Sequence, residues 1–107
     1  MNKQVKRKWL KALRSGEYQQ GDSQLLNKNN GNSYYCCLGV LEDIYRKEHG
    51  YLFPFEYQRY GYHTRPCAKW SGLDNSEKEG TARTLTGMND DDQLPFSEIA
   101  NWIEKNL

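Results

Sequence analysis

A chain of 107 residues with a formal net charge of +1 is long enough for one compact domain, and we expect residues 1–107 to form it. Apolar residues make up 36% of the sequence and aromatic residues 13%, so the core should be small and rich in aromatic rings. No stretch approaches the roughly 20 apolar residues of a membrane span, and the basic N-terminus lacks the apolar core of a signal peptide. We therefore expect a cytosolic protein that makes no contact with membranes.

The charges are unevenly distributed along the chain. Six cations and no acid occupy the first fourteen residues, which gives this segment +6 and leaves −5 for the rest. Within the same segment, Val5, Trp9 and Leu13 recur at helical intervals, and Gly16 follows as a stop. The pattern predicts an amphipathic helix over residues 3–14 whose outer surface is cationic, attached to an acidic body.

The next elements lead to the apolar centre of the chain. Asn and Gly residues over 27–33 separate the apolar pair 25–26 from the tyrosines 34–35, which predicts a hairpin tip between two short strands. The run 36–41 is small and apolar in a chain whose mean hydropathy is −1.01. Because only small side chains let two backbones approach closely, Gly39 and its neighbours predict a tightly packed strand-to-helix junction.

The remaining segments complete an α+β domain. Helical spacing predicts a second helix over residues 38–48 and a third over 96–107. Two prolines exclude a long helix over 51–70, which favours a loop with short strands or a helical turn, and the polar run 71–81 is typical of a surface loop. A last short strand is expected over 82–85. The fold prediction is about three helices packed on a small antiparallel sheet.

Three cysteines raise the question of thiol or metal chemistry. Cys36, Cys37 and Cys67 are an odd number without framework spacing, which predicts reduced thiols. With His63 they could form a four-ligand zinc set, or a thiol nucleophile beside a base. Adjacent residues of a strand point to opposite faces, however, so the spacing disfavours both. We predict buried free thiols, no metal, no cofactor and no catalytic residue.

An aromatic and basic segment follows the second helix. A nucleotide pocket needs flat rings for the base and fixed cations for the phosphates. The candidate ligand-binding side chains of this kind are Tyr57, Arg59, Tyr60, Tyr62, His63 and Arg65. The alternative, which stays open, is that the tyrosines cover the core and keep their hydroxyls in water.

Three motifs give the chain a resemblance. They are Ser15-Gly16-Glu17-Tyr18-Gln19-Gln20-Gly21, then Tyr35-Cys36-Cys37-Leu38-Gly39-Val40-Leu41-Glu42-Asp43, then Met88-Asn89-Asp90 followed by Phe96-Ser97-Glu98-Ile99-Ala100. With them the chain resembles a family of small proteins encoded by tailed bacteriophages and prophages, over residues 5–48 and 85–105. The segment 51–83 has no counterpart. The resemblance implies a phage accessory protein that works in the cytoplasm of the host bacterium, and it brings no catalytic residue with it.

The third motif adds two candidate residues. The carboxylates that start at Asp90 could bind Mg²⁺ together with substrate phosphates, but a turn that caps the last helix explains them more simply. Asn89 and Asp90 are retained as candidate ligand-binding residues because the resemblance includes them.

These observations favour a protein without catalytic activity that binds a small anionic ligand. Small phage proteins often inhibit host defence, and some sequester nucleotide immune signals, so a nucleotide-type signal is the ligand that the resemblance implies. Two alternatives remain open. One is a module that binds a host protein or, less favoured, nucleic acid through the basic first helix. The other is a small nucleotide-processing enzyme that uses His63. A homo-oligomer with its pocket between subunits also stays open.

Overall fold

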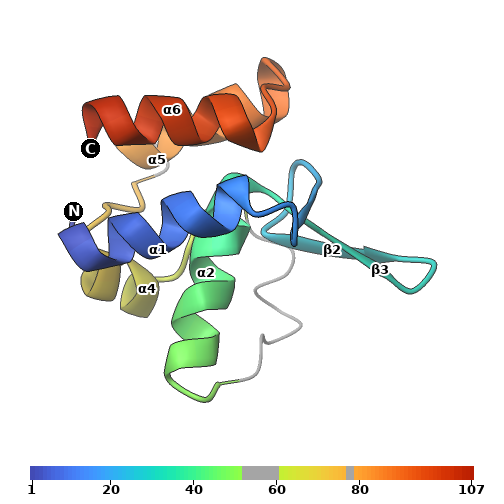
Figure 1. Ribbon diagram of the computed structural model, residues 1–107, viewed down its shortest axis with the longest axis horizontal. Helices are drawn as coiled ribbons and strands as arrows, with labels where there is room; N and C mark the ends of the chain where they lie inside the picture. The colour runs from blue at the N-terminus through green and yellow to red at the C-terminus, as the bar shows by residue number, and fades with distance from the viewer. Residues whose placement is uncertain (52–60, 77–78) are drawn as a thin grey trace.

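The computed structural model describes residues 1–51, 61–76 and 79–107 (Figure 1). Within these ranges the chain forms five α-helices, a π-helical turn and three short strands. In chain order they are α1 (Lys3–Arg14), β1 (Gln19–Gln20), β2 (Leu26–Asn29), β3 (Asn32–Tyr35), α2 (Cys37–Glu48), α4 (Arg65–Ser71), α5 (Thr81–Thr86), η1 (Gly87–Asp91) and α6 (Phe96–Asn106). The α+β class is confirmed, although the described residues hold five helices where about three were expected.

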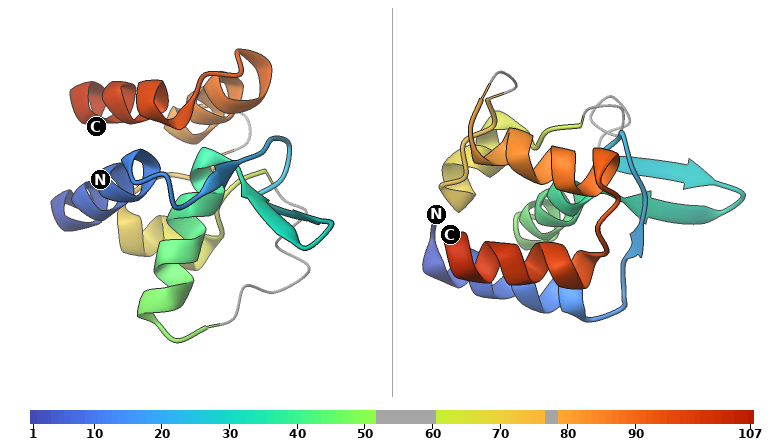
Figure 2. Two further views of the ribbon diagram at one scale, coloured as in Figure 1. Left: turned by 45° about the vertical axis from the view of Figure 1, so that its right-hand side comes forward. Right: turned by 90° about the horizontal axis from the view of Figure 1, so that it is seen from above.

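The two terminal helices pack side by side. Helix α1 has the predicted bounds, and the Asn2 side chain caps it by accepting hydrogen bonds from the backbone N–H groups of Gln4 and Val5. Helix α6 runs antiparallel to α1, so the two ends of the chain lie close together (Figure 2). The Trp9 ring fills the space between α1 and α2, where its Nε1–H donates to the Cys37 carbonyl at 2.9 Å. This bond satisfies the one polar atom of a fully buried ring.

The sheet is mixed, which corrects the antiparallel prediction. Strands β2 and β3 form the expected antiparallel hairpin, and both tip residues, Asn30 and Gly31, have positive φ. Strand β1 pairs in parallel with β3, giving the order β1-β3-β2. The chain reverses between β1 and β2 and again between β2 and β3, so β3 runs in the direction of β1. Two residues are too few for an alternating pattern to predict β1.

The packed junction predicted at residues 36–41 is confirmed. Cys36 caps α2, because its Sγ accepts a hydrogen bond from the Gly39 N–H at 3.3 Å. A Cβ atom on Gly39 would lie 1.8 Å from the Leu25 carbonyl oxygen, so only glycine fits there. The whole run is buried and forms the centre of the core.

Residues 82–85 belong to a helix, so the strand predicted there is wrong. Ala82 and Leu85 are both buried, and their spacing of three places them on one face of α5. Residues 65–71 form α4, which agrees with the helical turn that was one of the two forms predicted for this region. Thr64 caps α4 by accepting from the Cys67 N–H, and Pro66 occupies its first turn, where a missing N–H is tolerated.

Candidate functional site

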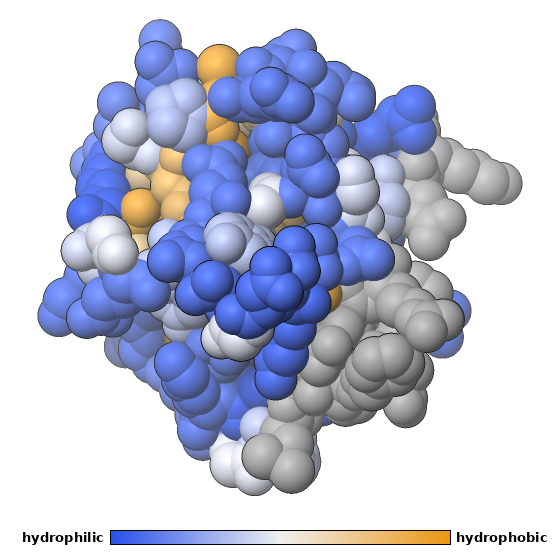
Figure 3. Space-filling view, turned by 90° about the vertical axis from the view of Figure 1, so that its right-hand side faces the viewer, coloured by the Kyte–Doolittle hydropathy of each residue, from blue (hydrophilic) through white to orange (hydrophobic). Residues whose placement is uncertain are grey.

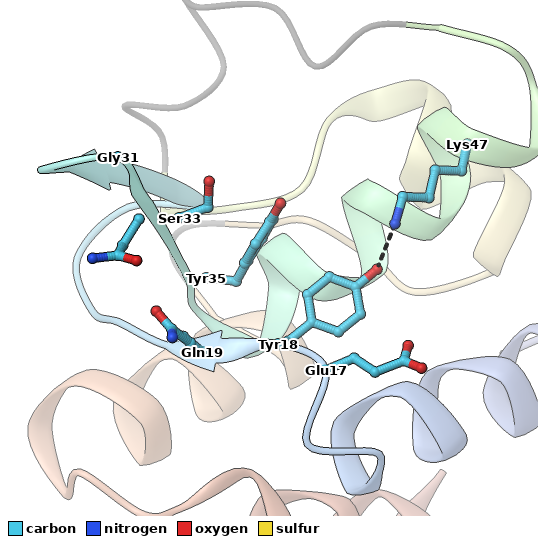
Figure 4. Close-up of a pocket in the computed structure, with 8 residues that line it drawn as sticks. Glu17, Tyr18, Gln19, Gly31, Ser33, Tyr35 and Lys47 are labelled. Atoms are coloured by element: carbon cyan, nitrogen blue, oxygen red, sulfur yellow. Dashed lines mark hydrogen bonds between the residues drawn. The ribbon is translucent and has the colours of Figure 1, made fainter.

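Residues of the first two motifs meet at an open hollow beside the sheet (Figure 4). We call it the tyrosine hollow. Its volume is about 330 Å³, and it lies between the segment that enters β1, the hairpin and helix α2. Its lining consists of Glu17, Tyr18, Gln19, Gly31, Asn32, Ser33, Tyr35 and Lys47.

One carboxylate organises the aromatic side of the tyrosine hollow. The Tyr18 hydroxyl donates to Asp43 Oδ2 at 2.5 Å, and Lys47 Nζ lies 3.0 Å from the same oxygen. Lys47 Nζ also lies 3.5 Å from the Tyr18 hydroxyl oxygen and 5.5 Å from the centre of its ring (Figure 4). The Tyr35 ring meets the Tyr18 ring edge-on, with centroids 4.9 Å apart. Asp43 therefore holds Tyr18 and Lys47 in place, and the Tyr18 ring supports Tyr35.

The two phenols keep their protons at neutral pH. Burial, followed by the hydrogen bond to Asp43, raises the pKa of Tyr18 well above its ordinary value. Burial, followed by the Asp43 charge, raises the pKa of Tyr35 as well. The Tyr18 proton is directed to Asp43, whereas the Tyr35 hydroxyl has no hydrogen bond within the described ranges. The hollow thus offers a phenol and the ammonium group of Lys47, whose side chain is 71% exposed.

A second hollow, of about 340 Å³, lies where β1 meets η1. We call it the amide hollow; its lining is Gln20, Gly21, Asp22, Asn89 and Gln93.

Asn89, which lines the amide hollow, is 2% exposed, and every hydrogen-bonding position of its side chain is occupied. Its Oδ1 accepts from Gln20 Nε2 at 3.0 Å and from the Cys37 N–H at 3.2 Å. Its Nδ2 donates to the Gly21 carbonyl at 2.9 Å and to Asp90 Oδ1 at 2.8 Å. Asn89 therefore ties η1 to β1 and to the start of α2, and it has no group left for a ligand.

The candidate residues predicted from the sequence are placed as follows. Three of them, Tyr57, Arg59 and Tyr60, lie outside the described residues. Tyr62 is half-buried against the core, and Arg65 is exposed in the first turn of α4.

His63 is 1% exposed, and its Nε2–H donates to the Leu73 carbonyl at 2.6 Å. Burial lowers the pKa of its imidazole, so the ring is neutral at neutral pH. The structure joins Asn89 to Asp90. No hydrogen bond among the described residues joins this pair to Tyr62, His63 or Arg65.

The prediction of buried free thiols is confirmed. Burial raises the pKa of Cys36 to about 12 and that of Cys37 and Cys67 above the ordinary value, so all three are protonated at neutral pH. Protonated, buried thiols are poor nucleophiles and poor metal ligands. Among the described residues no group of three or more His, Cys, Asp or Glu side chains is arranged to hold a metal ion.

Sequence reasoning missed the residues that form the tyrosine hollow. Tyr18, Tyr35 and Asp43 all belong to the motifs that carry the resemblance, so the motifs contained a usable signal. Lys47 follows Asp43 by four residues on α2, the spacing of a helical ion pair. No pattern in the sequence indicated that these residues lie together, because they come from three separate parts of the chain: the segment before β1, strand β3 and helix α2.

The fold and the tyrosine hollow define a small α+β domain with a polar, open ligand-sized site. None of its described helices is long and apolar enough to cross a membrane. The chain belongs to the family described as a domain of unknown function, DUF8296, whose model matches residues 1–107. No curated protein matches the chain, and no solved structure does.

Proposed function

We propose that this protein is a phage accessory protein without catalytic activity that binds a small anionic ligand in the tyrosine hollow. A nucleotide-type immune signal of the host is the ligand class we favour, and binding would act by sequestration in the host cytoplasm. The observation that carries the proposal is the grouping of two tyrosine rings, a free phenol and an exposed ammonium around about 330 Å³.

The size of the tyrosine hollow supports a single small molecule. Small-molecule pockets occupy about 300–1,000 Å³, so this hollow is at the lower end of the range. Seen from the hairpin end, the described surface is mostly hydrophilic and its hydrophobic area is small (Figure 3). This polarity favours a hydrogen-bonding, charged ligand over an apolar one.

Each side chain has a role in the proposed complex. Tyr35 contributes a ring for stacking and a hydroxyl that can donate or accept. Lys47 contributes a cation for phosphate or carboxylate, and the pair with Asp43 fixes where this cation lies. Tyr18 keeps the Tyr35 ring in position through the edge-on contact.

Burial of the two kinds of catalytic candidate favours binding over catalysis. The cysteine thiols and the His63 imidazole lie in the core, and His63 Nε2–H is engaged with a backbone carbonyl. The site predicted over residues 57–65 stays a prediction, because three of its six residues lie outside the described ranges.

Thermal unfolding in the presence of a panel of nucleotides and cyclic nucleotides tests the proposal. A ligand at about 100 times its Kd stabilises the folded state by about 2.7 kcal/mol, so the melting temperature rises. We expect Lys47→Gln to reduce the shift strongly and Tyr35→Phe to reduce it moderately. Lys28→Gln, an exposed lysine of the hairpin outside the hollow, is the matched control and should leave the shift unchanged.

Two outcomes would count against this function. If no compound of the panel raises the melting temperature, the ligand class is wrong. If a compound binds but is recovered in altered form after heat denaturation of the complex, the protein is an enzyme instead.

A further inference from the structure

Half of the cations of α1 are already engaged within the molecule. Lys6 Nζ donates to the Glu104 carbonyl at 3.1 Å, and Arg14 contacts the Glu104 carboxylate at 2.7 Å. Lys8 pairs with Glu48 of α2. These contacts attach α1 to its two neighbours, α6 and α2.

The other three cations, Lys3, Arg7 and Lys11, are exposed. In the part of the chain that the structure describes, none of them has a hydrogen bond or an ion pair. Their spacing of four places them in one line along the helix, about 6 Å apart. We call this line the α1 cation row. It lies opposite the buried face of α1, and the helix contains no acidic residue.

Helix α1 lies at the outside of the molecule, where a partner can reach the row. Seen from above, α1 forms one edge of the ribbon, next to α6 (Figure 2). The neighbouring helices α2 and α6 contribute the acids Glu48 and Glu104, and both are paired with cations of α1. The cations of α1 that make no contact within the described residues therefore form a single line, the α1 cation row.

We infer that the α1 cation row is a docking surface for an acidic segment of another protein, one whose carboxylates are spaced by four along a helix. Such a helix presents its acids about 6 Å apart, which matches the spacing of the row. Complementary charge of this kind determines register and accelerates association. The inference is independent of the tyrosine hollow, whose lining includes no residue of the row.

The charge of the whole chain favours protein over nucleic acid as the partner. Nucleic-acid binding relies on a broad basic surface that neutralises many phosphates. Here three free cations form a single line, the formal net charge is +1, and everything after residue 14 sums to −5. The remaining cations of α1 are already engaged with α2 and α6, so a larger polyanion would find few further free cations on this helix.

Fluorescence anisotropy with a synthetic helical peptide that carries Glu at every fourth position tests the inference. We expect Lys3→Gln/Arg7→Gln/Lys11→Gln to weaken binding about tenfold or more, and rising salt to weaken binding by the native protein. The matched control is Lys28→Gln/Lys69→Gln/Lys105→Gln, which removes the same charge from exposed lysines elsewhere and should change affinity less than about twofold. A peptide of the same composition with its Glu spacing scrambled should bind more weakly.

Three results would overturn the inference. If both triple variants lose the same affinity for the peptide, net charge alone determines binding. Equal affinity for the two peptides would mean that the row recognises no spacing. Tighter binding of a duplex of about 20 base pairs than of the peptide, lost in the row variant, would assign the surface to nucleic acid. Because none of these variants alters the hollow, a failure here leaves the nucleotide thermal-shift result unaffected.

Discussion

At Gly39, helix α2 passes very close to the backbone of Leu25, the residue before β2. A Cβ atom there would lie 1.8 Å from the Leu25 carbonyl oxygen and 2.7 Å from its carbon, and backbone atoms cannot move aside as a flexible side chain can. We expect Gly39→Ala to lower the free energy of unfolding by about 3 kcal/mol or more, because the helix must shift away from Leu25. Urea denaturation followed by circular dichroism measures this loss.

Gly87→Ala is the control for Gly39→Ala. Its φ is −59°, and a Cβ atom there would meet only Asp91 Oδ2, at 4.0 Å. The free energy of unfolding should change by less than about 1 kcal/mol and can rise, since alanine is the better helix former. Equal stability of the two variants would contradict the close approach at Gly39.

At the residue scale, the sequence contains the motifs but does not indicate which of their residues lie together. Asn89 illustrates this: it was a candidate for ligand binding, whereas its side chain bonds to Cys37 and Gln20, which are 52 and 69 positions away in the chain. Distances of this kind follow only from the fold. The same limit explains why Tyr18, Tyr35 and Asp43 were not recognised as one group.

At the scale of elements, a buried carboxylate attaches α4 to α2. Glu42 is fully buried; its Oε1 accepts from the Thr64 N–H at 2.7 Å, and its Oε2 accepts from Arg46 Nε at 2.9 Å. Oε2 also accepts from the Thr64 hydroxyl at 3.2 Å. One side chain thus supports both the N-cap residue of α4 and the neighbouring cation.

Glu42→Ala should lower the free energy of unfolding by about 3–5 kcal/mol, because it leaves the Thr64 N–H and a partly buried guanidinium without this partner. Chemical denaturation measures the effect. The control is Glu48→Ala, whose pair with Lys8 is exposed on both sides and worth about 0.2–1 kcal/mol. A loss for Glu42→Ala as small as that of the control would show that this contact does not hold α4.

Long periodic elements could be predicted and short ones could not. Helix α1, the hairpin and α6 each have a spacing or turn signal of their own, and the structure has them near the expected places. Strand β1 has two residues and α5 has six, so neither repeats a pattern often enough to identify it. Their form is set by contacts with distant segments, as the parallel pairing of β1 with β3 illustrates.

At the scale of the whole molecule, buried titratable groups limit the pH range of stability. Burial lowers the pKa of His63 from 6.5. Below about pH 6.5 the imidazole is therefore protonated in the unfolded chain but stays neutral in the folded chain. His63 therefore causes no loss of stability above that pH, and the free energy of unfolding declines as the pH falls below it. We expect the urea midpoint to drop between about pH 6.5 and 5, and His63→Gln, which can still donate to the Leu73 carbonyl, to reduce the drop.

As the pH rises, the buried thiols affect stability before the tyrosines, because the ordinary pKa is 9.0 for a thiol and 10.0 for a phenol. Burial raises the pKa of Cys36 from 9.0 to about 12, and it raises those of Cys37 and Cys67 as well, so above pH 9 the unfolded chain loses protons that the folded chain keeps. The unfolded state is then favoured, by up to about 1.4 kcal/mol per pH unit for each thiol. We expect the urea midpoint to fall steadily from pH 9 to 10.5. Cys36→Ser keeps an oxygen that can cap α2 but removes one titrating thiol, so its midpoint should fall less steeply; a native midpoint that stays constant over this range would contradict the burial of the thiols.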